Sequence, residues 1–262
     1  NYMFKHLEVK DGLSNNQVNA IYKDSHGFMW FGTASGLNRY DGYDTRIYRS
    51  LKDDGNSLPD SYIEDIQEDA TGNLWVRTGA GYAIYNSVSD IFDRNVEGWM
   101  WHIGISGNPS TVYIDSEKIF WIYVAGKGIY CYKPGQENAV MVAGTDTLLT
   151  EMNITDMTEC SEGILLAFGN GVLACLDREK LNVKWTFDGI ASQWGKNQSE
   201  TFTLFVDSHE RVWMYSVEGM WVYHLPKKSW EVRSVRSDRS NMVRAISQDK
   251  YGNIWIGRDQ DG

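Results

Sequence analysis

The chain is poor in the features that mark a disulfide scaffold or a nucleic-acid-binding protein. It has 3 cysteines in 262 residues, so Cys131, Cys160 and Cys175 cannot all pair with one another. Cys131 and Cys175 stand in apolar strand-like runs, where free thiols usually act as small hydrophobic side chains. The 25 basic residues are outnumbered by 35 acidic residues, which gives a net charge of −10. That balance disfavours contact with nucleic acid, because nothing offsets repulsion from the phosphates.

Long apolar runs and local catalytic motifs are also missing. No run of 18 or more apolar residues occurs, so no segment is predicted to be a membrane-spanning helix. The 5 histidines are dispersed and form neither an HExxH motif nor a close cluster with cysteine. No GxSxG elbow, P-loop or strand-linked GxGxxG motif is present. The sequence therefore predicts a segment with no metal site, no cofactor and no enzymatic activity of its own.

Tryptophan, by contrast, recurs through the chain at a nearly constant interval. The anchor positions lie 42 to 47 residues apart, and Leu166 stands where one tryptophan is missing. An aspartate precedes each tryptophan by 6 residues, and Cys160 replaces it in the fourth unit. The anchors are Trp30, Trp75, Trp121, Trp213 and Trp255, with Asp24, Asp69, Asp115, Asp207 and Asp249 before them. Because a residue repeated in every unit serves packing, we expect the tryptophans to be buried wedges.

The spacing inside each unit predicts four short strands. The segment from Asp24 to Gly27 is typical of a tight turn, because aspartate bonds its own backbone and glycine adopts positive φ without strain. Later Gly and Tyr residues mark a second turn and a third strand, and segments such as 45–48 supply a fourth. Four strands at this period are typical of a propeller blade, and the lack of helical periodicity excludes a helical solenoid.

The chain is therefore predicted to be all-β, a β-propeller of four-stranded antiparallel blades. We expect a single partial domain over residues 1–262, with about six units, the last of them truncated. Residues 2–9 alternate like a strand that closes the ring and removes free sheet edges. The expected boundaries are a closing strand at 1–10 and units at approximately 12–55, 56–98, 99–143, 144–190, 191–236 and 237–262.

Three of the units carry a specific motif. In the first unit, residues 11–18 read DGLSNNQV, residues 24–33 read DSHGFMWFGT and residues 36–42 read GLNRYDG. The second unit has NSLP at 56–59 and GNLW at 72–75, and the sixth has GNIWIG at 252–257. These units closely resemble the two-component-regulator propeller repeat, and units three to five resemble it more weakly.

This resemblance implies the periplasmic sensor domain of membrane-anchored hybrid histidine kinases of gut bacteria, which detect oligosaccharides and switch on polysaccharide utilisation. It also implies a seven-bladed ring, further propeller and signalling domains in the same polypeptide, and a homodimer of the full-length protein. Any kinase activity would then lie outside this chain, and this segment would contact no nucleic acid.

Two classes of propeller enzyme are the alternatives. Sialidases have Asp-box turns in which threonine precedes tryptophan, whereas Met29, Leu74 and Ile254 stand at that position here. A lyase resembling the streptogramin-inactivating type shares Asp-x-x-Gly-x-Leu-Trp repeats and uses a histidine base beside a metal-binding acid. His102 is the plausible base for that activity. Either alternative would make the chain a lyase or a glycan-degrading enzyme in place of a sensor.

Ligand contacts are expected where the units depart from their own pattern. Six such residues occupy blade connections or the turns that follow anchor strands, which open on one face of a propeller. They are Trp99, Trp101, His102, Trp194, Arg77 and Arg258. Sugars stack on aromatic rings and accept hydrogen bonds from planar donors, so this set predicts an oligosaccharide site. The alternative is that the tryptophans form satellite packing clusters and that Arg77 pairs with a carboxylate.

Overall fold

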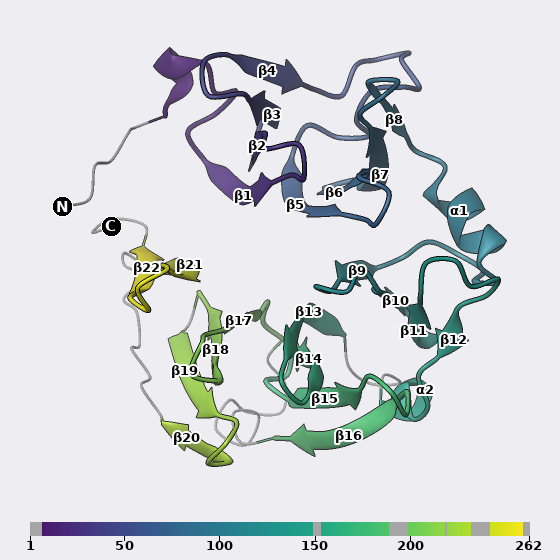
Figure 1. Ribbon diagram of the computed structural model, residues 1–262, viewed down its shortest axis with the longest axis vertical. Helices are drawn as coiled ribbons and strands as arrows, with labels where there is room; N and C mark the ends of the chain where they lie inside the picture. The colour runs from purple at the N-terminus through teal and green to yellow at the C-terminus, as the bar shows by residue number, and fades with distance from the viewer. Residues whose placement is uncertain (1–6, 149–152, 189–198, 218, 232–241, 259–262) are drawn as a thin grey trace. The chain divides into compact units, whose positions relative to one another are not determined.

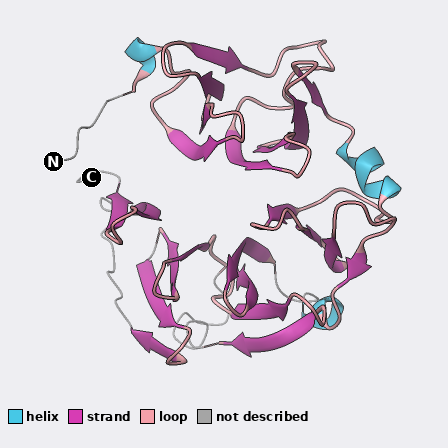
Figure 2. Cartoon of the chain, in the orientation of Figure 1, coloured by secondary structure: helices cyan, strands magenta, loops and turns pink. Residues whose placement is uncertain are grey.

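The structure is a computed structural model that describes residues 7–148, 153–188, 199–217, 219–231 and 242–258. Its regular elements are nearly all strands, as Figure 2 shows. The helical elements are a 3-10 turn, η1 (Val9–Asp11), and two short helices, α1 (Val96–His102) and α2 (Thr145–Leu148). Among the described residues, no helix is long and apolar enough to cross a membrane.

The strands form five four-stranded antiparallel sheets, each built from four consecutive strands (Figure 1). The first blade contains β1 (Val18–Lys23), β2 (Met29–Thr33), β3 (Gly36–Tyr40) and β4 (Thr45–Tyr48). The second contains β5 (Ile63–Glu68), β6 (Leu74–Thr78), β7 (Gly81–Asn86) and β8 (Ile91–Asp93). The third contains β9 (Thr111–Ile114), β10 (Phe120–Val124), β11 (Gly128–Tyr132) and β12 (Val140–Met141).

The remaining strands repeat the same order. The fourth blade contains β13 (Ile154–Cys160), β14 (Gly163–Phe168), β15 (Leu173–Asp177) and β16 (Asn182–Phe187). The fifth contains β17 (Thr203–Val206), β18 (Arg211–Ser216), β19 (Gly219–His224) and β20 (Ser229–Glu231), and β21 (Val243–Gln248) pairs with β22 (Ile254–Arg258). The predicted all-β propeller of four-stranded antiparallel blades is confirmed for five blades, and two strands of the sixth unit are described. The seven-bladed ring stays a prediction.

The chain divides into two compact units. The first consists of residues 1–110, 117–119 and 133–139, and it contains the first two blades and α1. The second consists of residues 111–116, 120–132 and 140–262, and it contains the third to fifth blades, α2 and the two-stranded sheet. Of the expected closing strand, residues 1–6 lie outside the described part, and Val9 to Asp11 form η1.

The repeated aspartate builds the turn between the first two strands of a blade. In the first blade, Asp24 Oδ1 accepts hydrogen bonds from the backbone N–H groups of His26 (3.0 Å) and Phe28 (2.9 Å). Gly27 completes the turn at a φ of 92°, which glycine adopts at little cost. Oδ1 of Asp69, Asp207 and Asp249 makes the same pair of bonds in the other turns. The turn chemistry expected from the sequence is confirmed.

The second carboxylate oxygen of the same aspartate fixes the tryptophan anchor. Oδ2 accepts a hydrogen bond from the indole Nε1, at 2.7 Å between Asp24 and Trp30. The other four pairs lie 3.2, 2.9, 2.9 and 3.1 Å apart: Asp69–Trp75, Asp115–Trp121, Asp207–Trp213 and Asp249–Trp255. Because a buried indole N–H needs an acceptor, this bond lets the ring enter the core in one orientation.

The anchors are not all buried. Trp30, Trp75 and Trp121 are at most 1% exposed, and the substitute Leu166 is fully buried. Trp213 is half-buried, and the prediction is wrong for Trp255, whose exposed fraction is 45%. A wedge is buried only when apolar residues cover both of its sides, and β21 and β22 form a sheet of two strands that packs on the fifth blade.

Neighbouring sheets pack face to face through apolar side chains. Trp30 and Leu37 of the first blade join Leu74, Val76 and residues around them on the second blade in one cluster. Equivalent clusters join the fourth blade to the fifth, and the fifth to the two-stranded sheet. This two-sided burial explains why the second strands are apolar at consecutive positions.

A polar bond between neighbouring sheets recurs beside the aspartate turn. The serine that follows Asp24 donates its backbone N–H and its hydroxyl to the Glu68 carboxylate, with Ser25 Oγ 2.6 Å from Oε1. The same arrangement joins Ser116 to Glu159 and Ser161 to Glu210. Between Ser208 and Gln248 the serine N–H donates to the amide oxygen, and the amide nitrogen donates to the serine hydroxyl. Each of these junctions therefore combines an apolar interface with a directional polar bond.

Replacing Trp75 with alanine is expected to lower the free energy of unfolding by about 3–5 kcal/mol, the cost of truncating a buried aromatic side chain. Trp101→Ala is the matched control, because Trp101 is 69% exposed. It should change the same quantity by less than about 0.5 kcal/mol. Denaturant titration followed by circular dichroism measures both, and similar losses for the two variants would contradict the wedge assignment.

Asp207→Asn is expected to make the stability of the fold less dependent on pH in the acidic range. Burial alone would raise the pKa of Asp207, but hydrogen bonds from Trp213 and Arg211 outweigh it and hold the pKa below its ordinary value. A depressed carboxyl pKa contributes stability above the unfolded value of about 3.9, which is lost as pH falls through the folded value. Relative to the parent, the variant should therefore lose the most stability at pH 7 and the least near pH 3. Thermal unfolding of both proteins at each pH measures this difference. An equal loss at both pH values would contradict this.

Candidate functional site

Three of the predicted ligand residues lie on α1, which follows the second blade. Asn95 caps this helix by accepting a hydrogen bond from the Gly98 N–H, and Val96 and Met100 are buried on its inner side. Trp99 packs edge-on against Trp75, with ring centroids 4.6 Å apart. Trp101 points elsewhere and is 69% exposed, because residues two apart on a helix face different directions. Trp99 thus belongs to a packing cluster.

His102 and Arg77 occupy different environments. His102 is exposed at the end of α1, and no three His, Cys, Asp or Glu side chains of the described part are grouped closely enough to hold a metal ion. Arg77 lies on β6, where its Nε is 2.8 Å from Glu64 Oε2 on β5 of the same blade. Its guanidinium also lies 6.0 Å from the Tyr82 ring.

The structure therefore brings together only part of the predicted set. Tyr82 lies 6.3 Å from Trp75, so Arg77 and Trp99 are linked through these two rings on one side of the second blade. Arg258 is half-buried at the end of β22, in the other compact unit. Trp194 lies outside the described residues.

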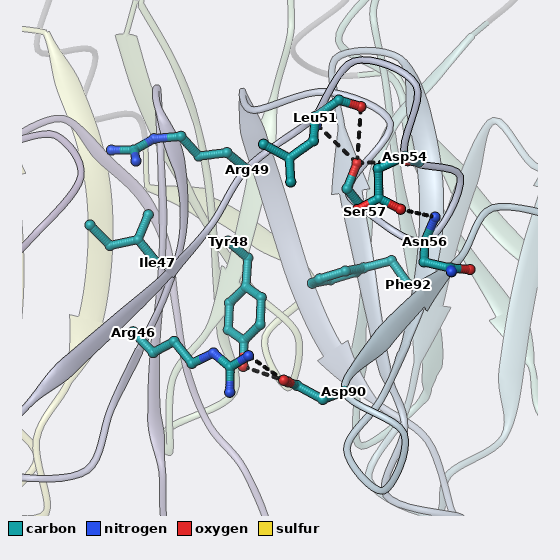
Figure 3. Close-up of a pocket in the computed structure, with 10 residues that line it drawn as sticks. All are labelled: Arg46, Ile47, Tyr48, Arg49, Leu51, Asp54, Asn56, Ser57, Asp90 and Phe92. Atoms are coloured by element: carbon teal, nitrogen blue, oxygen red, sulfur yellow. Dashed lines mark hydrogen bonds and ion pairs between the residues drawn. The ribbon is translucent and has the colours of Figure 1, made fainter.

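A pocket that the sequence analysis did not predict lies in the first compact unit. It has a volume of about 320 Å³ and opens between β4, the loop that leads to β5, and β8 (Figure 3). We call it the Asp90 pocket. It is lined by Arg46, Ile47, Tyr48, Arg49, Leu51, Asp54, Asn56, Ser57, Asp90 and Phe92. This volume falls in the range of small-molecule sites.

Asp90 forms the polar wall of this pocket. Its Oδ1 accepts hydrogen bonds from the hydroxyls of Tyr48 (2.8 Å) and Tyr85 (2.7 Å), and its carboxylate forms an ion pair with Arg46. Arg39 donates to the Tyr85 hydroxyl at 3.3 Å. Arg46 and Tyr48 come from the first blade and Asp90 from the second, so these bonds join two repeats.

The backbone at Asp90 adopts a left-handed conformation. Its φ is 57°, in the left-handed region, at the turn between the third and fourth strands of the blade. The corresponding turns of the fourth and fifth blades hold Leu181 and Lys228 in the same region, with φ of 50° and 48°. The left-handed conformation is therefore a feature of this turn in three blades, and the second blade alone of these three places a carboxylate there.

The charge state of this cluster is fixed around neutral pH. Burial raises the pKa of Tyr48, and hydrogen bonds with Tyr85 and Asp90 raise it further. Burial likewise raises the pKa of Tyr85. Burial alone would raise the pKa of Asp90, but the bonds from both tyrosines and the charge of Arg46 hold it below its ordinary value. Proton transfer needs a group whose pKa lies near the working pH, so this cluster suits binding better than acid–base catalysis.

The opposite wall is a loop fixed by backbone bonds. Arg94 donates to the carbonyl oxygens of Asp54, Ser57 and Leu58, at 2.6 to 2.9 Å. The Asn56 backbone is held on both sides, because its N–H donates to Asp54 Oδ1 and its carbonyl accepts from the Phe92 N–H. The wall is therefore ordered before any ligand arrives, which lowers the entropy cost of binding.

Sequence reasoning missed this pocket for an identifiable reason. Its residues lie in fourth strands and the loop after them, which are the least regular parts of the repeat. The usable signal was local. Arg46 and Tyr48 lie on one fourth strand and Arg49 follows it, and Asp90 stands at a turn position held by Leu181 and Lys228 elsewhere. Only the fold shows that these two segments face one another.

Comparison with known proteins is consistent with the repeat pattern. The family model described as "Two component regulator propeller" matches residues 12–35, 57–80 and 237–257, the three units with the clearest motif. Histidine kinase P4 of Formosa agariphila is 41% identical over 58 residues, which are 22% of this chain and 4% of that protein.

Three solved structures share the fold. The extracellular domain of a putative hybrid two component system of B. thetaiotaomicron is 18% identical, with a TM-score of 0.59, and the match covers 98% of this chain and 41% of that one. The extracellular domain of a putative one component system of B. thetaiotaomicron is 20% identical, with a TM-score of 0.69, over 96% and 36%. Streptogramin B lyase is 12% identical, with a TM-score of 0.60, over 91% and 75%.

At these identities the solved structures establish the fold alone. The chain spans less than half of the length of the two extracellular domains and 4% of the kinase. The matched segments are repeats, and the same Asp, Gly and Trp positions recur in each. The chain therefore carries segments that match the two-component regulator propeller repeat, at residues 12–35, 57–80 and 237–257.

Proposed function

We propose that this chain is part of the extracytoplasmic sensor domain of a hybrid two-component signalling protein and binds an oligosaccharide. The family repeats support the signalling role. One structurally similar protein is the extracellular domain of a putative hybrid two component system, and another is that of a putative one component system. The Asp90 pocket is the observation that carries the binding role. It combines aromatic and aliphatic walls with planar polar groups, which is the chemistry that sugars require.

Localisation and partners follow from the same proposal. The segment would lie in the periplasm as part of an inner-membrane protein, with further propeller and signalling domains in the same polypeptide. The full-length protein would be a homodimer, in which ligand occupancy is reported to a distant kinase. A sensor of this kind does not convert its ligand chemically. Ligand binding acts only by shifting the equilibrium between conformations of the protein.

Of the residues expected to contact ligand, Trp101 and His102 keep exposed side chains and remain proposed contacts. Trp99 packs against Trp75, and Arg77 forms an ion pair with Glu64. The last two are therefore better explained as parts of the second blade than as parts of a ligand site.

A lyase is the second candidate, because Streptogramin B lyase has a similar fold at 12% identity. His102 would be its base. A metal-binding acid beside His102 is required for that activity, and His102 is exposed at the end of a short helix. The geometry of the described residues favours the sensor.

The purified chain is expected to bind an oligosaccharide saturably and to release no product. Isothermal titration against plant and host glycan fragments measures binding, and chromatography of the same mixtures after prolonged incubation measures cleavage. His102→Ala separates the two candidates. Product formation that disappears in His102→Ala would overturn the sensor, whereas binding without product, with or without His102, supports it.

A further inference from the structure

We propose that the Asp90 pocket selects an uncharged sugar unit through vicinal hydroxyl groups, with Asn56 and Leu51 as the contacts that decide affinity. This inference rests on the proposed oligosaccharide sensing and names the class of sugar and the residues that select it. It follows from the balance of charged side chains in the pocket lining, from the lining side chains that already have bonding partners and from those that remain exposed.

The pocket has no net charge to offer. Its lining contains two arginines and two aspartates: Arg46, Arg49, Asp54 and Asp90. Arg46 is already committed to the Asp90 carboxylate, and it also lies 5.0 Å from the Tyr48 ring. Arg49 donates its Nε to the Ser35 carbonyl at 3.0 Å. A uronate or a sulfated sugar would therefore meet balanced charges, and only a neutral sugar avoids the cost of removing an anion from water.

Asn56 offers the hydrogen-bonding groups that a neutral sugar needs. Its side chain is exposed at the pocket wall, and its amide has no hydrogen-bond partner among the described residues, while its backbone is fixed by Asp54 and Phe92. A carboxamide both donates and accepts, so one Asn56 side chain can bond two neighbouring hydroxyls of a pyranose. The fixed backbone holds the residue at the pocket wall, so less backbone freedom is lost on binding.

Apolar surface completes the site. Leu51 is 56% exposed at the pocket, and Figure 3 shows it on the loop above the Tyr48 and Phe92 rings. These two rings meet edge to face, with centroids 5.5 Å apart. The C–H face of a sugar would cover Leu51 while its hydroxyls reach Asn56.

The test compares sugar classes and pocket variants in the same purified chain. Neutral xylo-, manno- and cello-oligosaccharides are titrated beside oligogalacturonates and sulfated chondroitin disaccharides, at low and at high salt. We expect a neutral series to bind with an affinity that changes less than twofold between the two salt concentrations, because uncharged ligands are not screened. Asn56→Ala and Leu51→Ala should each weaken it about tenfold, or about 1.4 kcal/mol.

Two controls keep these outcomes interpretable. Val88→Ala changes a turn residue that is 95% exposed and does not line the pocket, so it should leave affinity unchanged. Asn56→Asp keeps the shape and removes the donors, so it should weaken binding as Asn56→Ala does. Both pocket residues are exposed, so their substitution should leave the fold intact. Circular dichroism of each variant verifies this.

The possible failures are distinguishable. Preferential binding of the acidic sugars, lost at high salt or in Arg49→Ala, would overturn the inference and leave the sensor proposal intact. Neutral binding that survives Asn56→Ala and Leu51→Ala would show that sugars bind elsewhere on the chain and would also overturn it. If no glycan of either class binds, the proposed oligosaccharide sensing itself fails.

Discussion

One aspartate carboxylate organises each regular repeat, because its two oxygens accept different hydrogen bonds. Oδ1 closes the turn between the first two strands, and Oδ2 accepts the indole N–H of the anchor tryptophan. A large ring can enter the core only if its N–H finds an acceptor there, and a buried carboxylate is stable only if donors surround it. The two residues therefore depend on one another. The fourth repeat agrees with this coupling, since Cys160 and Leu166 replace both members together.

With the tryptophans fixed, neighbouring sheets meet through apolar faces that would allow sliding if nothing else joined them. The serine–carboxylate bonds beside the turns give each such junction a direction. Glu210 illustrates how strongly this bond is maintained. It stands at a left-handed turn position, with φ of 58°, where Gly27 and Gly252 stand in other repeats. A side chain there costs backbone strain, and Glu210 in this position accepts a hydrogen bond from the Ser161 hydroxyl at 2.6 Å.

A scaffold built from equal repeats leaves specificity to the places where the repeats differ. Position 90 is such a place, because a strained turn common to three blades carries a carboxylate in one of them. That carboxylate is neutralised by Arg46 and held by two tyrosine hydroxyls, so it shapes a polar wall without leaving a free charge. The long connection after the second blade differs as well, but its Trp99 was used for packing. Departure from the repeat therefore marks candidate positions without saying whether they bind ligand or fill space.

The sequence by itself determined the all-β blade pattern, the four strands of each of the first five units and the aspartate turns. These features depend on residues within about 20 positions of one another, where turn chemistry and strand periodicity act directly. The tertiary structure decided the rest. It placed Trp99 against Trp75, left Trp255 exposed on a two-stranded sheet, and brought Tyr48 to Asp90, which lies in the next repeat. Contacts between repeats depend on how whole sheets pack, because each sheet must bury two faces at once, and no local pattern records which irregular loops that packing brings together.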